Sequence, residues 1–168
     1  MATFRIDPDQ SRVWIEARSS LHPIHGEAAG LSGIVEADVA DGHVAFNGSP
    51  KISVELPVEA LKSGKALEDK EMLRRVDARR FPTIRGEVRE LKEMSDGQYR
   101  VRGDLTFHGI TRPVEGELSI KADNSSIVLE GEQTFDIRDF GVDPPKILML
   151  KVHPDVKVRV RAIAEQES

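Results

Sequence analysis

Two neighbouring segments of the chain decide its fold: Gln98–Phe107, which reads QYRVRGDLTF, and Pro113–Lys121, which reads PVEGELSIK. In each segment, apolar or small residues alternate with polar residues. A period of two is typical of a β-strand with one buried and one solvated face. The five residues between the segments, His108–Arg112, include a glycine and have a common hairpin-loop length. The two segments therefore predict an antiparallel hairpin.

The same alternation recurs along most of the chain, between turn residues. It predicts further strands at Arg12–Arg18, Leu31–Val39, His43–Phe46, Lys51–Leu56, Thr83–Leu91, Ser126–Phe135 and around Val156–Ala162. Trp14 is an exception, because it falls on the charged side of its segment. A break or bulge is expected at Leu21–Gly26, since Pro23 cannot donate to a strand ladder. Half-buried strands must share a core, and a closed barrel removes the exposed sheet edges.

Residues 57–80 depart from this pattern and form a helical insertion. Within it, Ala66–Val76 predicts a helix, with acidic residues in its first half and Arg74 and Arg75 near its end. This charge distribution complements the helix dipole. Because the apolar face is incomplete, we expect the helix to lie over the barrel.

Five glycines lie on the apolar side of their predicted strands: Gly33, Gly86, Gly103, Gly116 and Gly131. One interpretation is that they permit strand coiling and corners. Another, compatible with the first, is that they leave room inside, since a barrel of about eight strands can just hold one small or slender ligand. We therefore predict an all-β fold, an antiparallel eight-stranded lipocalin-like barrel with one short helical insertion, in a single domain over residues 1–168.

Composition narrows the functional classes. The 168 residues suit one domain, and the absence of cysteine excludes disulfides and thiolate chemistry. A net charge of −5 argues against a nucleic-acid partner. No apolar run approaches the roughly 20 residues of a membrane span. The first residues lack the basic-then-apolar plan of a signal peptide, so we expect a cytoplasmic protein, or a periplasmic or secreted one if a leader has been removed.

Four motifs, in order along nearly the whole chain, resemble the YceI family of lipocalin-like barrels: Ile6–Val13, Phe81–Ile84, Gly103–Val114 and Asp136–Val142. The resemblance implies an extended eight-stranded barrel with a helical flap. It also implies an apolar pore similar to those that hold a long isoprenoid or another amphiphilic chain. Ala28 and Gly86 stand where the family usually has aromatic residues, which should widen the pore or change what fills it.

The polar residues form no familiar catalytic or metal motif. His22 and His25 lack the further converging ligands that zinc needs. There is no Gly-x-Ser-x-Gly elbow or cysteine nucleophile, and Asp136 and Asp139 are expected to form a salt-bridged turn with Arg138. We therefore expect no enzyme activity, no cofactor and no metal.

His108 and the run Ile147–Leu150 each keep more than one interpretation. His108 is expected either to bond the backbone as a turn residue or to contact a ligand head group at the barrel mouth. Ile147–Leu150 is expected to be a core strand, an apolar lip for lipid entry, or a patch that contacts a membrane or a second subunit. Transient membrane contact and a homodimer are therefore left open.

We predict that the barrel binds an apolar or amphiphilic chain, isoprenoid-like or fatty-acid-like, and carries or sequesters it. The predicted contacts are the inward residues and those near one end: Ile15, Ala17, Val35, Met72, Phe81, Ile84, Leu105, Phe107, His108, Leu118, Phe135, Phe140, Leu148 and Leu150. One alternative is a filled barrel that acts as a stress-related or protein-interaction module. A second is a small-molecule enzyme, which would need converging polar groups with perturbed pKa values in the pore.

Overall fold

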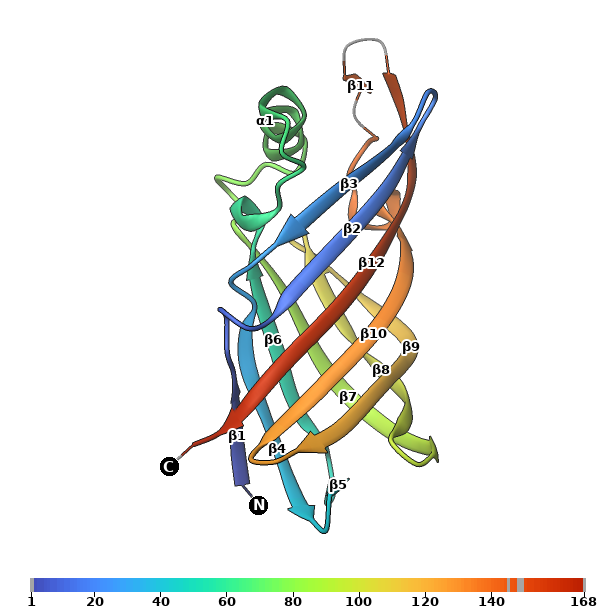
Figure 1. Cartoon of the computed structure of the whole chain (residues 1–168). Coiled ribbons are helices and arrows are strands. Elements are labelled where there is room, and N and C mark those ends of the chain that lie inside the picture. The colour runs from blue at the N-terminus through green and yellow to red at the C-terminus, as the bar shows by residue number, and fades with distance from the viewer. Residues whose placement is uncertain (1, 145, 148–149, 168) are drawn as a thin grey trace.

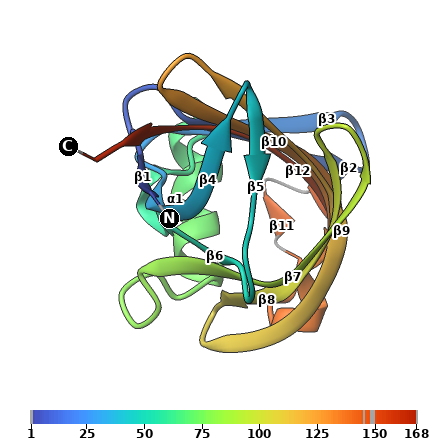
Figure 2. The ribbon, with the colours of Figure 1, turned by 90° about the horizontal axis from the view of Figure 1, so that it is seen from below.

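The structure, a computed structural model, describes residues 2–144, 146–147 and 150–167, with the backbone alone for Lys146, Ile147 and Leu150. Eight antiparallel strands form a closed ring (Figures 1 and 2). In order around the ring they are β1 (Ala2–Ile6), β4 (Ser32–Ala40), β6 (Lys51–Pro57), β7 (Thr83–Ser95), β8 (Gln98–Phe107), β9 (Ile110–Asp123), β10 (Ser126–Asp136) and β12 (Leu150–Gln166).

Strand β1 closes the ring. Phe4 lies opposite Val35 of β4 on one side and opposite Gln166 of β12 on the other. The predicted all-β barrel is therefore confirmed. Two short strands lie off the ring: β5 (His43–Ala45) pairs with β4, and β11 (Lys146–Ile147) pairs with β12. No helix in the described part of the chain is long and apolar enough to cross a bilayer.

A second hairpin, of β2 (Arg12–Ser19) and β3 (Pro23–Ala28), extends the wall from β12 toward the upper end in Figure 1. Its far edge is joined to the loop before the helix by two backbone hydrogen bonds, of 2.9 and 3.1 Å, between Glu27 and Lys62. The break expected over Leu21–Gly26 is wrong in extent. The Ser19 N–H donates to the His22 carbonyl oxygen at 3.1 Å, so the turn is tight. Pro23 then begins β3, where its missing donor is tolerated.

The hairpin that decided the fold has a shorter turn than predicted. Phe107 pairs directly with Ile110, which leaves two turn residues in place of five. Both turn residues have positive φ, 55° at His108 and 73° at Gly109, the geometry of a turn that matches strand twist. Because the strands continue to the turn, Pro113 lies within β9, opposite Asp104.

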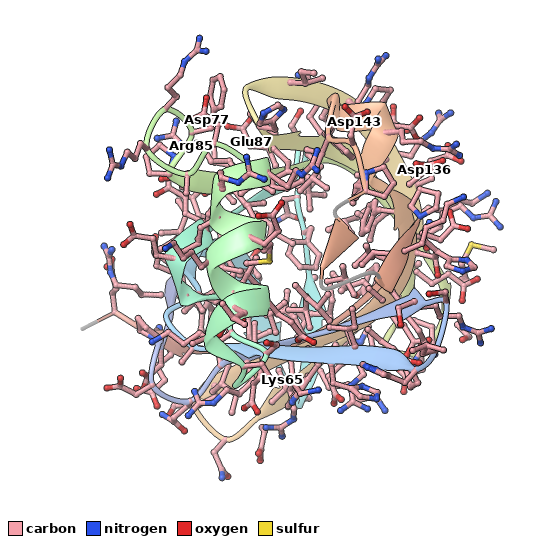
Figure 3. The ribbon with its side chains drawn as sticks, turned by 90° about the horizontal axis from the view of Figure 1, so that it is seen from above. Lys65, Asp77, Arg85, Glu87, Asp136 and Asp143 are labelled. Atoms are coloured by element: carbon pink, nitrogen blue, oxygen red, sulfur yellow. The ribbon has the colours of Figure 1, made fainter. Side chains whose placement is uncertain are left out.

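Helix α1 (Ala66–Arg75) follows a 3₁₀ turn, η1 (Val58–Ala60), and lies over one side of the upper end (Figure 3). The loop before the helix is fixed by Asp69, whose carboxylate accepts from the N–H and the hydroxyl of Ser63, each at 2.8 Å. The Glu71 carboxylate accepts from Arg74 at 2.7 Å and from Arg75 at 3.2 Å. The predicted helix is confirmed to within one residue at its end.

The two faces of the wall differ as the alternation predicts. The lower half of the barrel is a packed core that includes Phe4, Ile6, Val35, Ala37, Tyr99, Ile120, Ile127 and Ala164. The outer face carries cross-strand ion pairs, such as Arg85 with Glu55 at 3.1 Å and Lys157 with Glu132 at 3.2 Å. Trp14 lies opposite Arg159, whose guanidinium is 4.4 Å from the centre of the indole ring. This cation–π contact explains why Trp14 falls on the charged side of β2.

Candidate ligand-binding cavity

A cavity of about 490 Å³ lies inside the barrel, above the packed core and below α1. Its wall comes from the inward residues of β2, β6, β7, β8, β9, β10 and β12. These residues are nearly all aliphatic, aromatic or glycine, because each strand turns every second side chain inward. An apolar chain in this cavity would be shielded from water and would contact the wall along much of its length.

Nine of the fourteen residues predicted to contact a ligand line this cavity: Ile15, Ala17, Met72, Ile84, Leu105, Phe107, Leu118, Phe135 and Phe140. Leu148 lies outside the described residues, and so does the side chain of Leu150. The expectations for the apolar run Ile147–Leu150 therefore remain predictions.

Three of the predicted residues do not line the cavity. Val35 is 0% exposed in the packed core, because strand alternation fixes which face a residue takes but not its depth along the barrel. Phe81 and His108 pack against each other outside the cavity, with ring centres 5.1 Å apart.

His108 bonds the backbone, as the first of its two interpretations predicts. Its Nδ1 lies 3.0 Å from the Phe140 carbonyl oxygen, to which it donates. Phe140 ends η2 (Ile137–Phe140), the 3₁₀ turn that follows β10. The short turn aims the imidazole at η2, and His108 does not line the cavity. His108 therefore ties the β8–β9 hairpin to the segment after β10.

The turn at η2 is salt-bridged as predicted, through Asp136. Its carboxylate accepts from the Arg138 guanidinium at 2.6 Å and from the Arg138 N–H at 2.9 Å. Both bonds hold the pKa of the Asp136 carboxyl below its ordinary value, and the bond from the Arg138 side chain has the larger effect. Both groups are engaged with each other, so the pair serves structure at this site.

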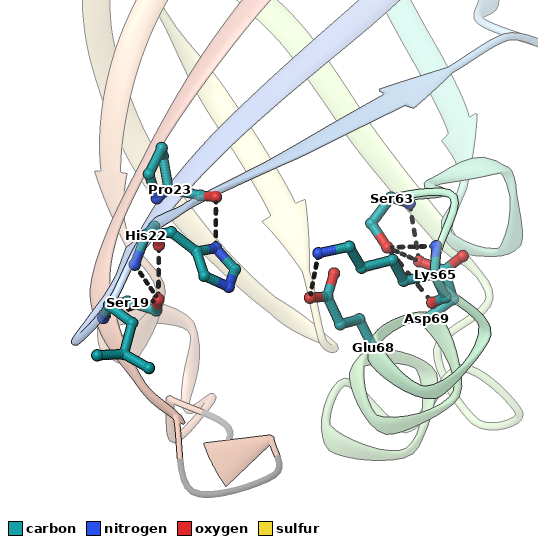
Figure 4. Close-up of polar contacts among 8 residues, drawn as sticks. Ser19, His22, Pro23, Ser63, Lys65, Glu68 and Asp69 are labelled. Carbon is teal, nitrogen blue, oxygen red and sulfur yellow. Dashed lines mark hydrogen bonds and ion pairs between the residues drawn. The ribbon is translucent and has the colours of Figure 1, made fainter.

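Polar side chains gather where the cavity meets α1. They come from β3, the loop before the helix and the helix itself: His25, Lys62, Ser63, Glu68, Asp69 and Arg75. Glu68 is almost fully buried, and its carboxylate lies 3.8 Å from the Lys65 ammonium (Figure 4). A long ligand could therefore keep a polar end at this mouth and its apolar part below.

His22 does not line the cavity and bonds the backbone of its own turn. Its Nδ1 lies 2.9 Å from the Pro23 carbonyl oxygen (Figure 4). Within the described ranges, no three His, Asp or Glu side chains are placed to hold one metal ion.

The inward glycines serve both of the predicted purposes, at different positions. A Cβ at Gly33 would lie 2.0 Å from the Ser53 carbonyl oxygen, and one at Gly103 would lie 2.3 Å from the Glu87 carbonyl oxygen. These two glycines let neighbouring strands approach. At Gly86 and Gly116, a Cβ would meet only side chains, at 3.0 and 3.5 Å, and both glycines line the cavity. They leave space for a ligand.

One polar residue on the cavity wall is missing from the sequence-based prediction. Gln133 lies on the same side of β10 as Leu129, Gly131 and Phe135, and it lines the cavity. The signal was its position within the alternation, since every second residue from Ile127 points inward.

A closed antiparallel barrel with an internal apolar cavity defines the class of lipocalin-like β-barrel proteins. The YceI-like domain model matches residues 4–164, so the chain belongs to this family.

Similar proteins agree with this assignment. A UPF0312 protein of Pseudomonas putida is 24% identical over 168 residues, which cover 94% of this chain and 85% of the relative. Two solved structures share the fold. BcnA of Burkholderia cenocepacia has a TM-score of 0.80 at 16% identity, covering 94% of this chain and 98% of that one. A polyisoprenoid binding domain from Saccharophagus degradans, implicated in plant cell wall breakdown, has a TM-score of 0.79 at 12% identity, covering 99% and 100%.

Proposed function

We propose that this protein binds an apolar or amphiphilic chain in its barrel, without a covalent bond, and carries or sequesters it rather than transforming it. The observation that carries this proposal is the cavity wall. The inward strand positions that line the cavity are aliphatic, aromatic or glycine except for Gln133, whereas the charged strand residues at its margin, such as Glu115 and Glu132, lie on the outward side of their strands. A wall of this kind offers burial to a chain and little polar chemistry to a reaction.

The energy of binding would be hydrophobic. Each 100 Å² of chain surface removed from water contributes about 2.5 kcal/mol, before the cost of ordering the chain is subtracted. The polar residues at the mouth allow an amphiphile to keep its head group near water. The likeness to a domain described as polyisoprenoid-binding supports an extended, isoprenoid-like or fatty-acid-like ligand.

The proposal is tested first on the purified protein. Native mass spectrometry and solvent extraction should find a co-purified lipid, or the protein should bind the apolar fluorophore N-phenyl-1-naphthylamine after delipidation. A protein that holds neither lipid nor fluorophore would overturn the proposal.

A matched pair of variants then places the binding inside the barrel. Ala17 faces the cavity, and its neighbour Glu16 lies on the other side of the same strand. Ala17→Phe should weaken fluorophore binding about tenfold or more, because the new ring occupies ligand space. Glu16→Phe adds the same ring outside and should bind as the wild type does. Equal loss in both variants would place the binding elsewhere on the protein. Circular dichroism should show that both variants keep the fold.

A further inference from the structure

The barrel wall has an unpaired seam between β9 and β10. The register between these strands runs from Ser126–Asp123 to Gly131–Leu118 and ends there. Both strands continue beyond that point, β9 back to Ile110 and β10 on to Asp136. Each also keeps its other neighbour, β8 or β12, along this stretch. We call the facing unpaired segments 113–117 and 132–136 the β9–β10 seam.

Gln133 lies at this seam and faces the cavity. Its neighbours on the inner face are apolar or glycine: Gly131 and Phe135 along β10, and Val158 opposite it on β12. Across the seam is Gly116, where a Cβ would lie 3.5 Å from the Gln133 Oε1. The amide therefore reaches over the position that has no side chain. Gly116 leaves the space, and Gln133 supplies the polar atoms.

The side-chain amide of Gln133 makes no hydrogen bond to any residue that the structure describes. While the cavity holds water, water can satisfy the amide. Gln133 is exposed beside the seam, and a pure hydrocarbon that covered its amide would displace this water and leave the amide unpaired, which costs free energy. A chain with an oxygen at this level would instead accept from the amide N–H, and a hydroxyl could also donate to Oε1.

The charges beside the seam bear on the ligand class. The outward residues of the seam include Glu115, Glu117 and Glu132. Lys157 pairs with Glu132 at 3.2 Å and Arg102 pairs with Glu115, on the outer face. Because these cations are engaged on the outer face and the inward residues at this level are uncharged, a carboxylate at the seam would lose its hydration without gaining a counter-charge. A neutral oxygen-bearing group suits it better.

We infer that Gln133 is a specificity-determining residue, which hydrogen-bonds a hydroxyl or carbonyl group of the bound chain at the β9–β10 seam. The barrel thereby favours neutral oxygen-bearing amphiphiles over the corresponding hydrocarbons and carboxylates. This inference rests on the proposed function, because it concerns the same cavity.

The test compares three probes of equal length, dodecan-1-ol, dodecane and dodecanoate, which compete with N-phenyl-1-naphthylamine. Gln133→Met removes the amide but keeps an unbranched side chain. It should weaken dodecan-1-ol binding about 3- to 10-fold, the worth of one neutral hydrogen bond, and should leave dodecane binding equal or tighter. Dodecanoate should bind the wild type more weakly than dodecan-1-ol.

Two further variants serve as controls. Gln133→Leu should shift the alcohol-to-hydrocarbon affinity ratio in the same direction, so the result does not depend on how one variant folds. Thr134→Val removes a hydroxyl from the outward neighbour and should leave the ratio unchanged. If the probes bind but both Gln133 variants keep the wild-type ratio, the inference fails and the proposed function stands. If the wild type binds no probe, both fail.

Discussion

The hydroxyl of Tyr99 donates a 3.0 Å hydrogen bond to the carbonyl oxygen of Val44 and so joins β8 to β5 at the packed end of the barrel. Tyr99 is 5% exposed, and its ring meets Phe46 edge-on with centres 5.9 Å apart. The pKa of the Tyr99 phenol is raised from 10.0 to about 12, mainly because the ring is buried and secondly because Glu93 lies close to it. The packed end is therefore sensitive to alkaline pH.

The first prediction concerns this pH dependence. Since the folded pKa lies above the unfolded one, the neutral phenol stabilises the fold below pH 10, and this contribution is lost as the pH rises toward 12. Tyr99 is the only tyrosine, so absorbance at 295 nm reports it alone. The folded protein should titrate well above the urea-unfolded protein. Tyr99→Phe should show no transition. A folded midpoint near 10 would contradict the prediction.

The second prediction concerns the Trp14–Arg159 contact on the outer face. An exposed cation–π pair contributes about 0.5–1 kcal/mol, so Arg159→Gln should lower the free energy of unfolding by that amount. Trp14 is the only tryptophan, and its fluorescence should change with the same substitution. Urea denaturation followed by circular dichroism measures the effect. In a Trp14→Phe background, Arg159→Gln should lower the free energy of unfolding by less than it does in the wild type. An equal loss in both backgrounds would assign the effect to the charge of Arg159 alone.

The third prediction separates the two kinds of inward glycine. In Gly103→Ala the new methyl group would meet the Glu87 carbonyl oxygen at 2.3 Å, so strands must shift, and we expect a loss of about 2–4 kcal/mol. In Gly116→Ala the nearest atom is a flexible side-chain oxygen at 3.5 Å, so the change should stay within about 1 kcal/mol. Denaturation midpoints of the two variants make the comparison. Equal losses would show that both glycines serve strand packing.

The fourth prediction concerns the β8–β9 turn. His108 has φ 55°, a conformation that asparagine and glycine tolerate and β-branched residues do not. His108→Val should therefore destabilise the protein by about 2 kcal/mol, whereas His108→Asn should cost less. The loss of the bond to Phe140 is common to both variants, so their difference in thermal midpoint measures the backbone strain. Equal midpoints would mean that the side-chain bond dominates.

Much of the fold follows from local patterns in the sequence. The alternation at Gln98–Phe107 fixes the face of each side chain, and the charge gradient over Ala66–Arg75 suits a helix. Such patterns depend on neighbours within a few residues, so the sequence alone shows them. Most residues of the cavity wall follow from the same alternation.

The remaining features depend on contacts between distant residues. Nothing near Phe4 indicates that β1 lies between β4 and β12, and nothing near Val35 indicates that it lies below the cavity. The two-residue β8–β9 turn requires a positive φ at His108. Contacts of the His108 ring with the Phe81 ring and the Phe140 carbonyl support this conformation, and both partners are distant in the sequence. Gln133 was overlooked because a polar residue in a strand is usually assigned to the solvent face.

The closure of the ring by β1 and β12 has a consequence for how the protein folds. Arg5 and Glu167, which pair across this closure, are 162 residues apart in the chain. Pairing over such a separation is slow, because the entropy of closing a long loop is lost before any contact is gained. Until β12 docks on β1, the cavity wall is one face of an open sheet. The interior is therefore among the last surfaces to be shielded, and the nascent sheet presents an apolar face to chaperones, to other chains or to a ligand.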